Sequence, residues 1–241
     1  MQPKQIIRAI LSPSYLRDLF RFRQTSREAG RPVPKFSKIR PINEATGTTG
    51  FDTHYVYHTG WAARVLARLK PAHHVDIGSS LFFVSNVSAF VPMTHYDYRP
   101  PTFAIPGADV GAADLLALSF ADGSLPSLSC MHVIEHVGLG RYGDTLDPAG
   151  DARACAELKR VLAPGGYLLF VTPVGRPEIH FNAHRIYSFE AVMALFEGLE
   201  LAEFALITDK RDGAMLVMDA DPARVARQRY GCGCFLFRKP A

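Results

Sequence analysis

The sequence lacks any long apolar run, since no stretch reaches the roughly 18 apolar residues that a membrane-spanning helix needs. Its basic N-terminus is not followed by an apolar core of about 7–15 residues and a small-residue cleavage site, so no secretory signal is expected. Four cysteines in 241 residues do not suggest a disulfide framework. These absences favour a reduced, cytoplasmic protein.

Motifs for several chemistries are also missing. There is no P-loop and no nucleophile elbow. His132 and His136 are not on a helix, where four-residue spacing would bring two ligands together, so no metal site is expected. Cys232 and Cys234 have C-x-C spacing, but they lie in an apolar segment and are interpreted as core residues. The sequence contains no internal repeat.

Positive charge is concentrated at the start of the chain. Residues 1–40 hold ten Lys and Arg against two acids, a net +8, which leaves −4 for the rest of a chain whose total is +4. Residues 1–50 are therefore predicted to be a basic helical extension and linker, and residues 51–241 an α/β domain. Apolar spacing over residues 5–24 predicts one or two short amphipathic helices, interrupted at Pro13. They could pack on the main domain, or weakly contact an acidic partner or an anionic membrane surface.

From residue 52 onward, helical and strand patterns alternate. This order predicts a doubly wound, mostly parallel sheet with helices on both faces and an antiparallel last strand. The expected elements are helix 52–69, strand 74–78, helix 81–90, strand 93–98, a short third element at 113–116, strand 128–134, helix 151–162, strand 167–172, helix 188–196, strand 201–208 and strand 232–238.

An acid and an imidazole, Glu135 and His136, follow the apolar segment that starts at Leu128. Open α/β sheets build their sites at the carboxyl ends of strands. Imidazole titrates near neutrality, so His136 or His184 suits a general base. Glu135 could orient a histidine or touch a cofactor, or it could pair with an arginine and fix the loop.

A second group of residues has the spacing of a nucleotide-type site. Gly78 ends the first strand, in a turn where backbone can approach a ligand, and Asp97 ends the second strand about 20 residues on, where an acid can bind ribose hydroxyls. Asp114 could accept a hydrogen bond from an exocyclic amine, although a turn or a helix cap explains it equally well.

Several segments together resemble the motifs of class I S-adenosylmethionine-dependent methyltransferases, and more narrowly a bacterial methyltransferase-like family designated a domain of unknown function. The broad motifs are residues 75–78, 97, 114–115, 118–122, 132–136 and 157–166, and the narrower ones are 52–55, 74–79, 128–143 and 181–186. The resemblance covers about residues 52–209. It implies a Rossmann-like, seven-stranded sheet that binds S-adenosylmethionine. The implied cofactor-binding residues are Asp76, Gly78, Ser79, Ser80, Asp97 for the ribose, and Asp114 and Leu115 for the adenine.

The acceptor side is predicted from the rim of the same sheet. Residues 138–148 form a glycine-punctuated loop suited to a lid, and residues 180–185 follow the fifth strand. Arg141, Tyr142, Asn182 and Arg185 are the predicted substrate residues, with Glu135, His136 and His184 as the catalytic ones. The leading hypothesis is a methyltransferase acting on a small-molecule or saccharide-linked acceptor.

Two other functions remain open. The family's glycine-rich loop usually has a glycine at the position of Ser80, so the single Gly78 also fits a catalytically inactive binding or scaffold protein. Nucleic-acid modification ranks last, because the basic segment is short and the body is acidic. The oligomeric state is not predicted.

Overall fold

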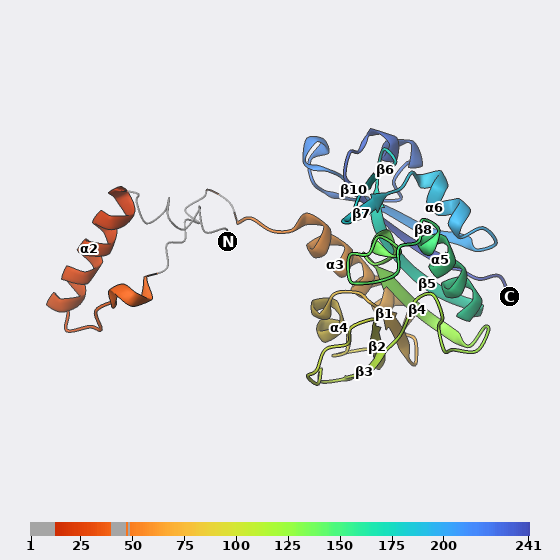
Figure 1. Ribbon diagram of the computed structural model, residues 1–241, viewed down its shortest axis with the longest axis horizontal. Coiled ribbons are helices and arrows are strands. Elements are labelled where there is room, and N and C mark those ends of the chain that lie inside the picture. The colour runs from red at the N-terminus through yellow and green to blue at the C-terminus, as the bar shows by residue number, and fades with distance from the viewer. Residues whose placement is uncertain (1–12, 40–46, 48) are drawn as a thin grey trace. The chain divides into compact units, whose positions relative to one another are not determined.

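The chain divides into two compact units, residues 1–50 and 51–241. The structure is a computed structural model that describes residues 13–39, 47 and 49–241 (Figure 1). No helix among these residues has both the length and the apolar character that crossing a bilayer requires.

The first unit contains the helix α2 (Pro13–Glu28) and the short helix η1 (Phe36–Lys38). The rings of Phe20 and Phe36 meet edge-on with centroids 6.3 Å apart, and the Arg23 guanidinium lies 4.1 Å from the centre of the Phe36 ring. A helix in the basic extension is thus confirmed from Pro13 onward. The part of that prediction on residues 5–12, and residues 40–46 and 48 of the predicted linker, lie outside the described residues.

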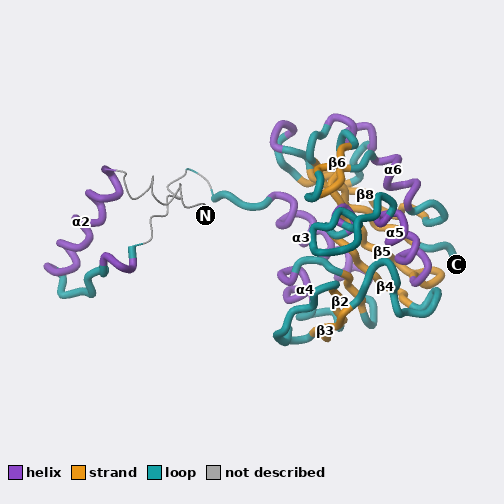
Figure 2. The backbone as a smooth tube through the Cα atoms, viewed as in Figure 1, coloured by secondary structure: helices purple, strands orange, loops and turns teal. Residues whose placement is uncertain are grey.

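The second unit is built on an eight-stranded sheet with the order β3-β2-β1-β4-β5-β10-β8-β9. Figure 2 draws the strands in orange and the helices in purple. The strands are β1 (His74–Ile77), β2 (Met93–Asp97), β3 (Ala108–Ala112), β4 (Leu125–Met131), β5 (Leu162–Val174), β8 (Glu200–Ile207), β9 (Leu216–Met218) and β10 (Gly231–Arg238). The first five are parallel, and β10 runs antiparallel between β5 and β8. The Rossmann-like class with an antiparallel last strand is confirmed. The sheet has one strand more than expected, because β9 adds an antiparallel edge to β8.

Helices cover both faces of this sheet. Buried residues of α3 (Thr53–Leu69) and α4 (Leu81–Val87) form one core with Leu169 and Val171 of β5. Buried residues of α5 (Gly150–Val161) and α6 (Phe189–Leu195) form the other core with Leu168 and Phe170. The alternation along β5 follows from the two-residue period of a strand and produces a three-layer domain.

Side-chain caps set the starts of these helices. The Asp52 carboxylate accepts from the Tyr55 amide at α3, and the Ser188 hydroxyl accepts from the Ala191 amide at α6. Both starts agree with the prediction, since Asp and Ser satisfy the free amides of a first helical turn. The helix α4 ends at Val87, earlier than the predicted residue 90.

Two strand predictions were wrong in position. The third strand is at Ala108–Ala112 rather than 113–116; its Asp109 and Gly111 give it a weak strand pattern, and pairing with β2 forms it. The fourth strand ends at Met131, because His132 adopts a left-handed φ of 56° that turns the chain. Glu135 therefore lies in the short helix η2 (Ile134–His136) rather than at a strand end.

Candidate functional site

Two cavities adjoin at the carboxyl edge of the parallel strands. The larger has a volume of about 680 Å³ and the smaller about 200 Å³. His132 and His136 line both of them. The segment after β4 thus forms a shared wall, which places one pair of imidazoles against two separate ligand spaces.

The smaller cavity contains four of the predicted cofactor residues, Gly78, Asp97, Asp114 and Leu115. Gly78 has a φ of 74°, and a Cβ atom there would lie 2.9 Å from a methyl group of Val133. Glycine is required at this turn for both reasons, since the left-handed conformation is costly for other residues. The close approach of Val133 makes the turn a tight wall of the cavity.

The acids of this cavity are arranged to receive hydroxyl or amine donors. One oxygen of Asp97 accepts from the Arg99 amide at 2.7 Å, and one oxygen of Asp114 accepts from the Leu116 amide at 2.9 Å. Across the described chain, no donor bonds the second oxygen of either carboxylate. Those oxygens fit a ribose diol and an exocyclic amine, so the acids present suit an adenosyl group.

The Arg99 guanidinium lies 4.3 Å from the centre of the Tyr142 ring, and Tyr142 itself lines the smaller cavity. At about 200 Å³ the cavity is below the roughly 300–1,000 Å³ typical of ligand pockets. Binding a whole S-adenosylmethionine molecule would therefore need more space than the cavity has here.

The other three predicted cofactor residues do not line either cavity. Asp76 is fully buried and bonds Nδ1 of His95 at 2.8 Å, the hydroxyl of Ser129 and the amide of Ser79. The Ser79 hydroxyl accepts from the Met131 amide, and the Ser80 hydroxyl caps α4. All three side chains stabilise the turn that holds Gly78.

Glu135 is a buried carboxylic acid against an imidazole. One oxygen, Oε1, lies 2.8 Å from Nδ1 of His132 and 3.8 Å from Nε2 of His136. Desolvation raises the pKa of Glu135 to about 7 and lowers the pKa of His132 to about 4. Glu135 thus lies beside a histidine, and among the described side chains it makes no ion pair with Arg141 or Arg185.

The tautomer of His136 follows from its contacts. Its Nδ1 lies 2.6 Å from the carbonyl oxygen of Ala183, which can only accept, so Nδ1 carries the proton. Burial lowers the pKa of His136, which keeps the ring neutral with Nε2 unprotonated. His184 lines the larger cavity and stacks on His180 with ring centres 4.9 Å apart.

The predicted substrate residues separate into two groups. Arg141 lines the larger cavity, and Tyr142 lines the smaller one. Asn182 is exposed in the hairpin of β6 (Glu178–His180) and β7 (His184–Ile186), outside both cavities. Arg185 is 5% exposed, bonds the Val137 carbonyl at 2.7 Å and pairs with Asp151, so it links the two flanks of the loop at residues 138–148.

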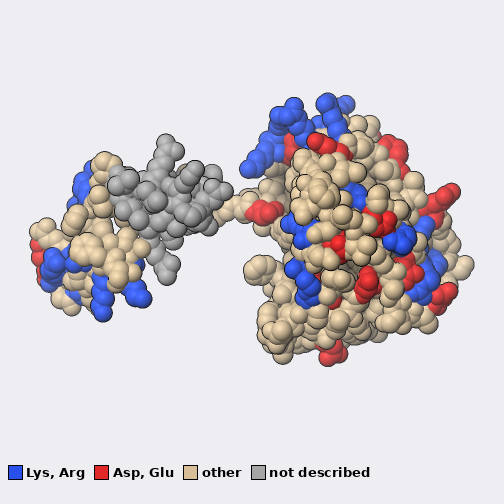
Figure 3. Space-filling model, viewed as in Figure 1, with Lys and Arg blue, Asp and Glu red and all other residues tan. Residues whose placement is uncertain are grey.

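The sequence did not reveal the opposite side of the larger cavity. His54 and Tyr55 reach it from the first turn of α3, and the His54 ring stacks with His132 at 5.5 Å and with Tyr230 at 5.0 Å. Residues 52–55 belong to the motifs of the family resemblance, but that resemblance gives His54 and Tyr55 no role. The cavity also has a basic rim, and Figure 3 shows Lys and Arg gathered at the end of the domain that carries the loops after β8. The rim cations are Arg141, Lys210, Arg211 and Arg229.

Comparisons with known proteins give a fold and a partial family match. Residues 122–218 match the model of a family described as a Caenorhabditis protein of unknown function, DUF268. None of the curated proteins matches the chain in sequence.

Solved structures resemble the chain at low sequence identity. The N-methyltransferase NodS from Bradyrhizobium japonicum, in complex with S-adenosyl-l-homocysteine, is 16% identical, with a TM-score of 0.51 over 78% of this chain and 88% of that one. The [4+2]-cyclase SpnF is 16% identical, with a TM-score of 0.53 over 82% of this chain and 85% of that one. YcgJ from Bacillus subtilis is 15% identical, with a TM-score of 0.52 over 77% of this chain and 99% of that one. The fold is that of the class I S-adenosylmethionine-dependent methyltransferases.

Proposed function

We propose that this chain is an S-adenosylmethionine-dependent methyltransferase that binds the cofactor in the smaller cavity and an anionic acceptor in the larger one. The observation that carries the proposal is the shared wall. His136 faces both a cavity with acids for an adenosyl group and a cavity able to hold a second molecule. Methyl transfer needs two ligand spaces that meet, and an acceptor that loses a proton also needs a base at the junction.

When bound, the cofactor supplies an electrophilic methyl group on a sulfonium. Asp97 would hold the ribose hydroxyls and Asp114 the adenine amine through their open carboxylate oxygens. Nε2 of His136, unprotonated because Nδ1 donates to Ala183, would take the proton that an acceptor hydroxyl or amine loses. The Arg99–Tyr142 pair would exclude water from the transfer.

The acceptor class follows from charge. Four cations line the larger cavity, against the three acids Asp52, Glu135 and Asp209. The Asp52 carboxylate caps α3, and Asp209 accepts from the amides of Arg211 and Arg229. Desolvation raises the pKa of Glu135 to about 7, so this carboxyl is only partly ionised near neutrality. A small molecule or saccharide that carries a carboxylate or phosphate suits this rim better than a neutral one.

Calorimetry with S-adenosylhomocysteine on the full chain tests the proposal. Binding with one site per chain is expected, and no heat at millimolar ligand would refute the enzyme. The second candidate is a non-catalytic binding protein, favoured by the inward-turned side chains of Asp76, Ser79 and Ser80. A non-catalytic binding protein would bind S-adenosylhomocysteine but would transfer no methyl group from labelled S-adenosylmethionine to any of a panel of anionic acceptors.

A further inference from the structure

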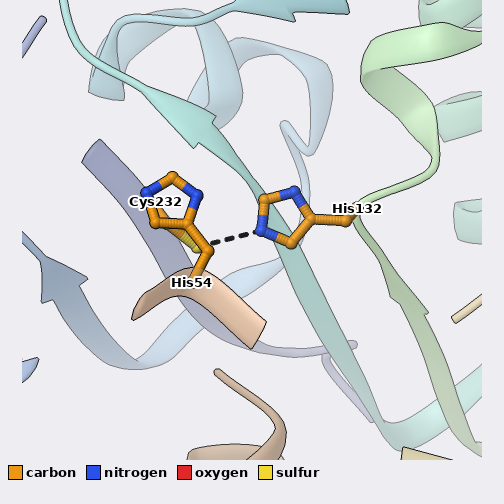
Figure 4. A group of neighbouring side chains, drawn as sticks. All are labelled: His54, His132 and Cys232. Carbon is orange, nitrogen blue, oxygen red and sulfur yellow. Dashed lines mark hydrogen bonds between the residues drawn. The ribbon is translucent and has the colours of Figure 1, made fainter. Parts of the chain in front are cut away.

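The larger cavity has a histidine, histidine and cysteine cluster on its wall. His54 of α3, His132 after β4 and Cys232 of β10 each offer one ligand atom, and these atoms all lie within 4.8 Å of one another (Figure 4). We propose that the cluster is a Zn²⁺ site with an open fourth position toward the cavity. This site is independent of whether the chain transfers methyl groups.

The distances suit a tetrahedral ion. Zinc bonds of about 2.3 Å to sulfur and about 2.0 Å to nitrogen put tetrahedral ligand atoms roughly 3.3–3.6 Å apart. Nε2 of His132 and Sγ of Cys232 are 3.4 Å apart. The His54 ligand atom lies within 4.8 Å of the other two, so the ring must come closer to bind the ion as the third ligand.

Glu135 provides the outer support that metal-binding histidines usually have. Its Oε1 lies against Nδ1 of His132, so Nδ1–H donates to the carboxylate and Nε2 is left to bind the ion. The second oxygen, Oε2, is buried with no hydrogen-bond partner in the described part of the chain. A buried carboxylate is costly without a compensating charge, and an adjacent dication supplies that charge.

The ligand types fit zinc. One thiolate with two imidazoles is a set that zinc shares with copper, and three protein ligands with an open position are the arrangement of catalytic zinc sites. Each histidine offers one ring nitrogen, and the cysteine binds as its thiolate, because a bound dication deprotonates a coordinating thiol.

The sheet explains why these residues meet. Cys232 and Cys234 lie on the α3 side of β10, and both belong to the core that α3 covers. Only Cys232 is near the strand end where His132 turns out of β4. The C-x-C spacing thus contains one proposed ligand and one core residue, which provides a matched control.

The test uses the full chain, freed of metal by dialysis against a chelator, and titrated with Zn²⁺ in competition with a chromophoric chelator. One equivalent should bind. Removing a ligand in Cys232→Ala or His54→Ala should weaken binding by more than roughly 100-fold, and Glu135→Gln by about 10–100-fold. Cys234→Ala and His73→Ala should bind as the unsubstituted chain does.

Cobalt gives a second readout. Co²⁺ in the same site should show a sulfur-to-metal absorption band that disappears in Cys232→Ala and persists in Cys234→Ala. His54→Ala, at the surface end of a helix, decides the matter if Cys232→Ala does not fold. The proposal is overturned if no equivalent of Zn²⁺ binds, or if the folded His54 and Cys232 variants keep full affinity.

Discussion

Oε1 of Glu135 lies 2.8 Å from Nδ1 of His132 and leaves the other carboxylate oxygen without a partner among the described residues. A single buried acid thus adjoins both candidate activities, as outer support for the metal cluster and as a neighbour of His136.

Asp97→Ala should weaken S-adenosylhomocysteine binding by about 10–100-fold, because a hydrogen bond to a charged group is worth about 1.5–3 kcal/mol. Calorimetry measures the loss. Asp109→Ala, on the adjacent edge strand and exposed, is the control and should bind normally. Equal affinities in the two variants would remove Asp97 from the cofactor site.

His136→Ala should lower methyl transfer by about 10²–10⁴-fold, the usual contribution of a general base, while cofactor affinity stays within a few-fold. Turnover with labelled S-adenosylmethionine and calorimetry give the two readouts. The control is His180→Ala, which removes a half-exposed imidazole outside both cavities. A variant of His136 with normal turnover would assign the base elsewhere.

Gly78→Ala should destabilise the domain by about 1–2 kcal/mol from its left-handed φ alone, with a further cost from the contact with Val133. Urea unfolding measures the change. Adding Val133→Ala removes the steric part and should recover only a portion of the loss. Complete recovery would show that the backbone conformation costs nothing at this turn.

His74 makes the domain sensitive to acid. It is fully buried between the hydroxyls of Ser127 and Ser129, and burial lowers its pKa to about 4 from 6.5. Between pH 6.5 and about 4, His74 is protonated in the unfolded chain but stays neutral in the native protein. Stability is therefore full above 6.5 and falls as pH drops toward 4, with a slope of up to about 1.4 kcal/mol per pH unit.

Urea unfolding between about pH 7 and about pH 5 tests this dependence. His74→Gln keeps polar contacts to the serines and should show a shallower slope than the unsubstituted chain. The surface variant His73→Gln should keep the original slope. Parallel slopes in all three proteins would mean that His74 is not responsible.

Most of the central fold could be predicted from the sequence, because local signals and tertiary packing agree there. The helix α3 has an Asp52 cap and a buried apolar stripe, and β5 has an unbroken apolar run. The strands β3 and β9 have little pattern of their own, so their position depends on neighbours. The end of β4 depends on the left-handed backbone of His132, and the hydrophobic pattern of the sequence contains no sign of that conformation.

The site could be predicted only where its residues lie at or just after the ends of neighbouring parallel strands. Gly78, Asp97 and Asp114 end successive strands, and topology alone brings them to one cavity. The metal cluster joins residues 54, 132 and 232, whose proximity depends on the antiparallel insertion of β10. Arg185 was expected at the rim, but its guanidinium reaches inward to the Val137 carbonyl.

The position of β10 also constrains how the domain is made. This strand pairs with both β5 and β8, yet the ribosome synthesises it after each of them. Until residues 231–238 emerge, the nascent chain holds two long apolar strands with unpaired edges, which are sites of misassociation. Closure of the sheet therefore waits for its final strand, and a ribosome stalled before that point would carry an open, aggregation-prone intermediate.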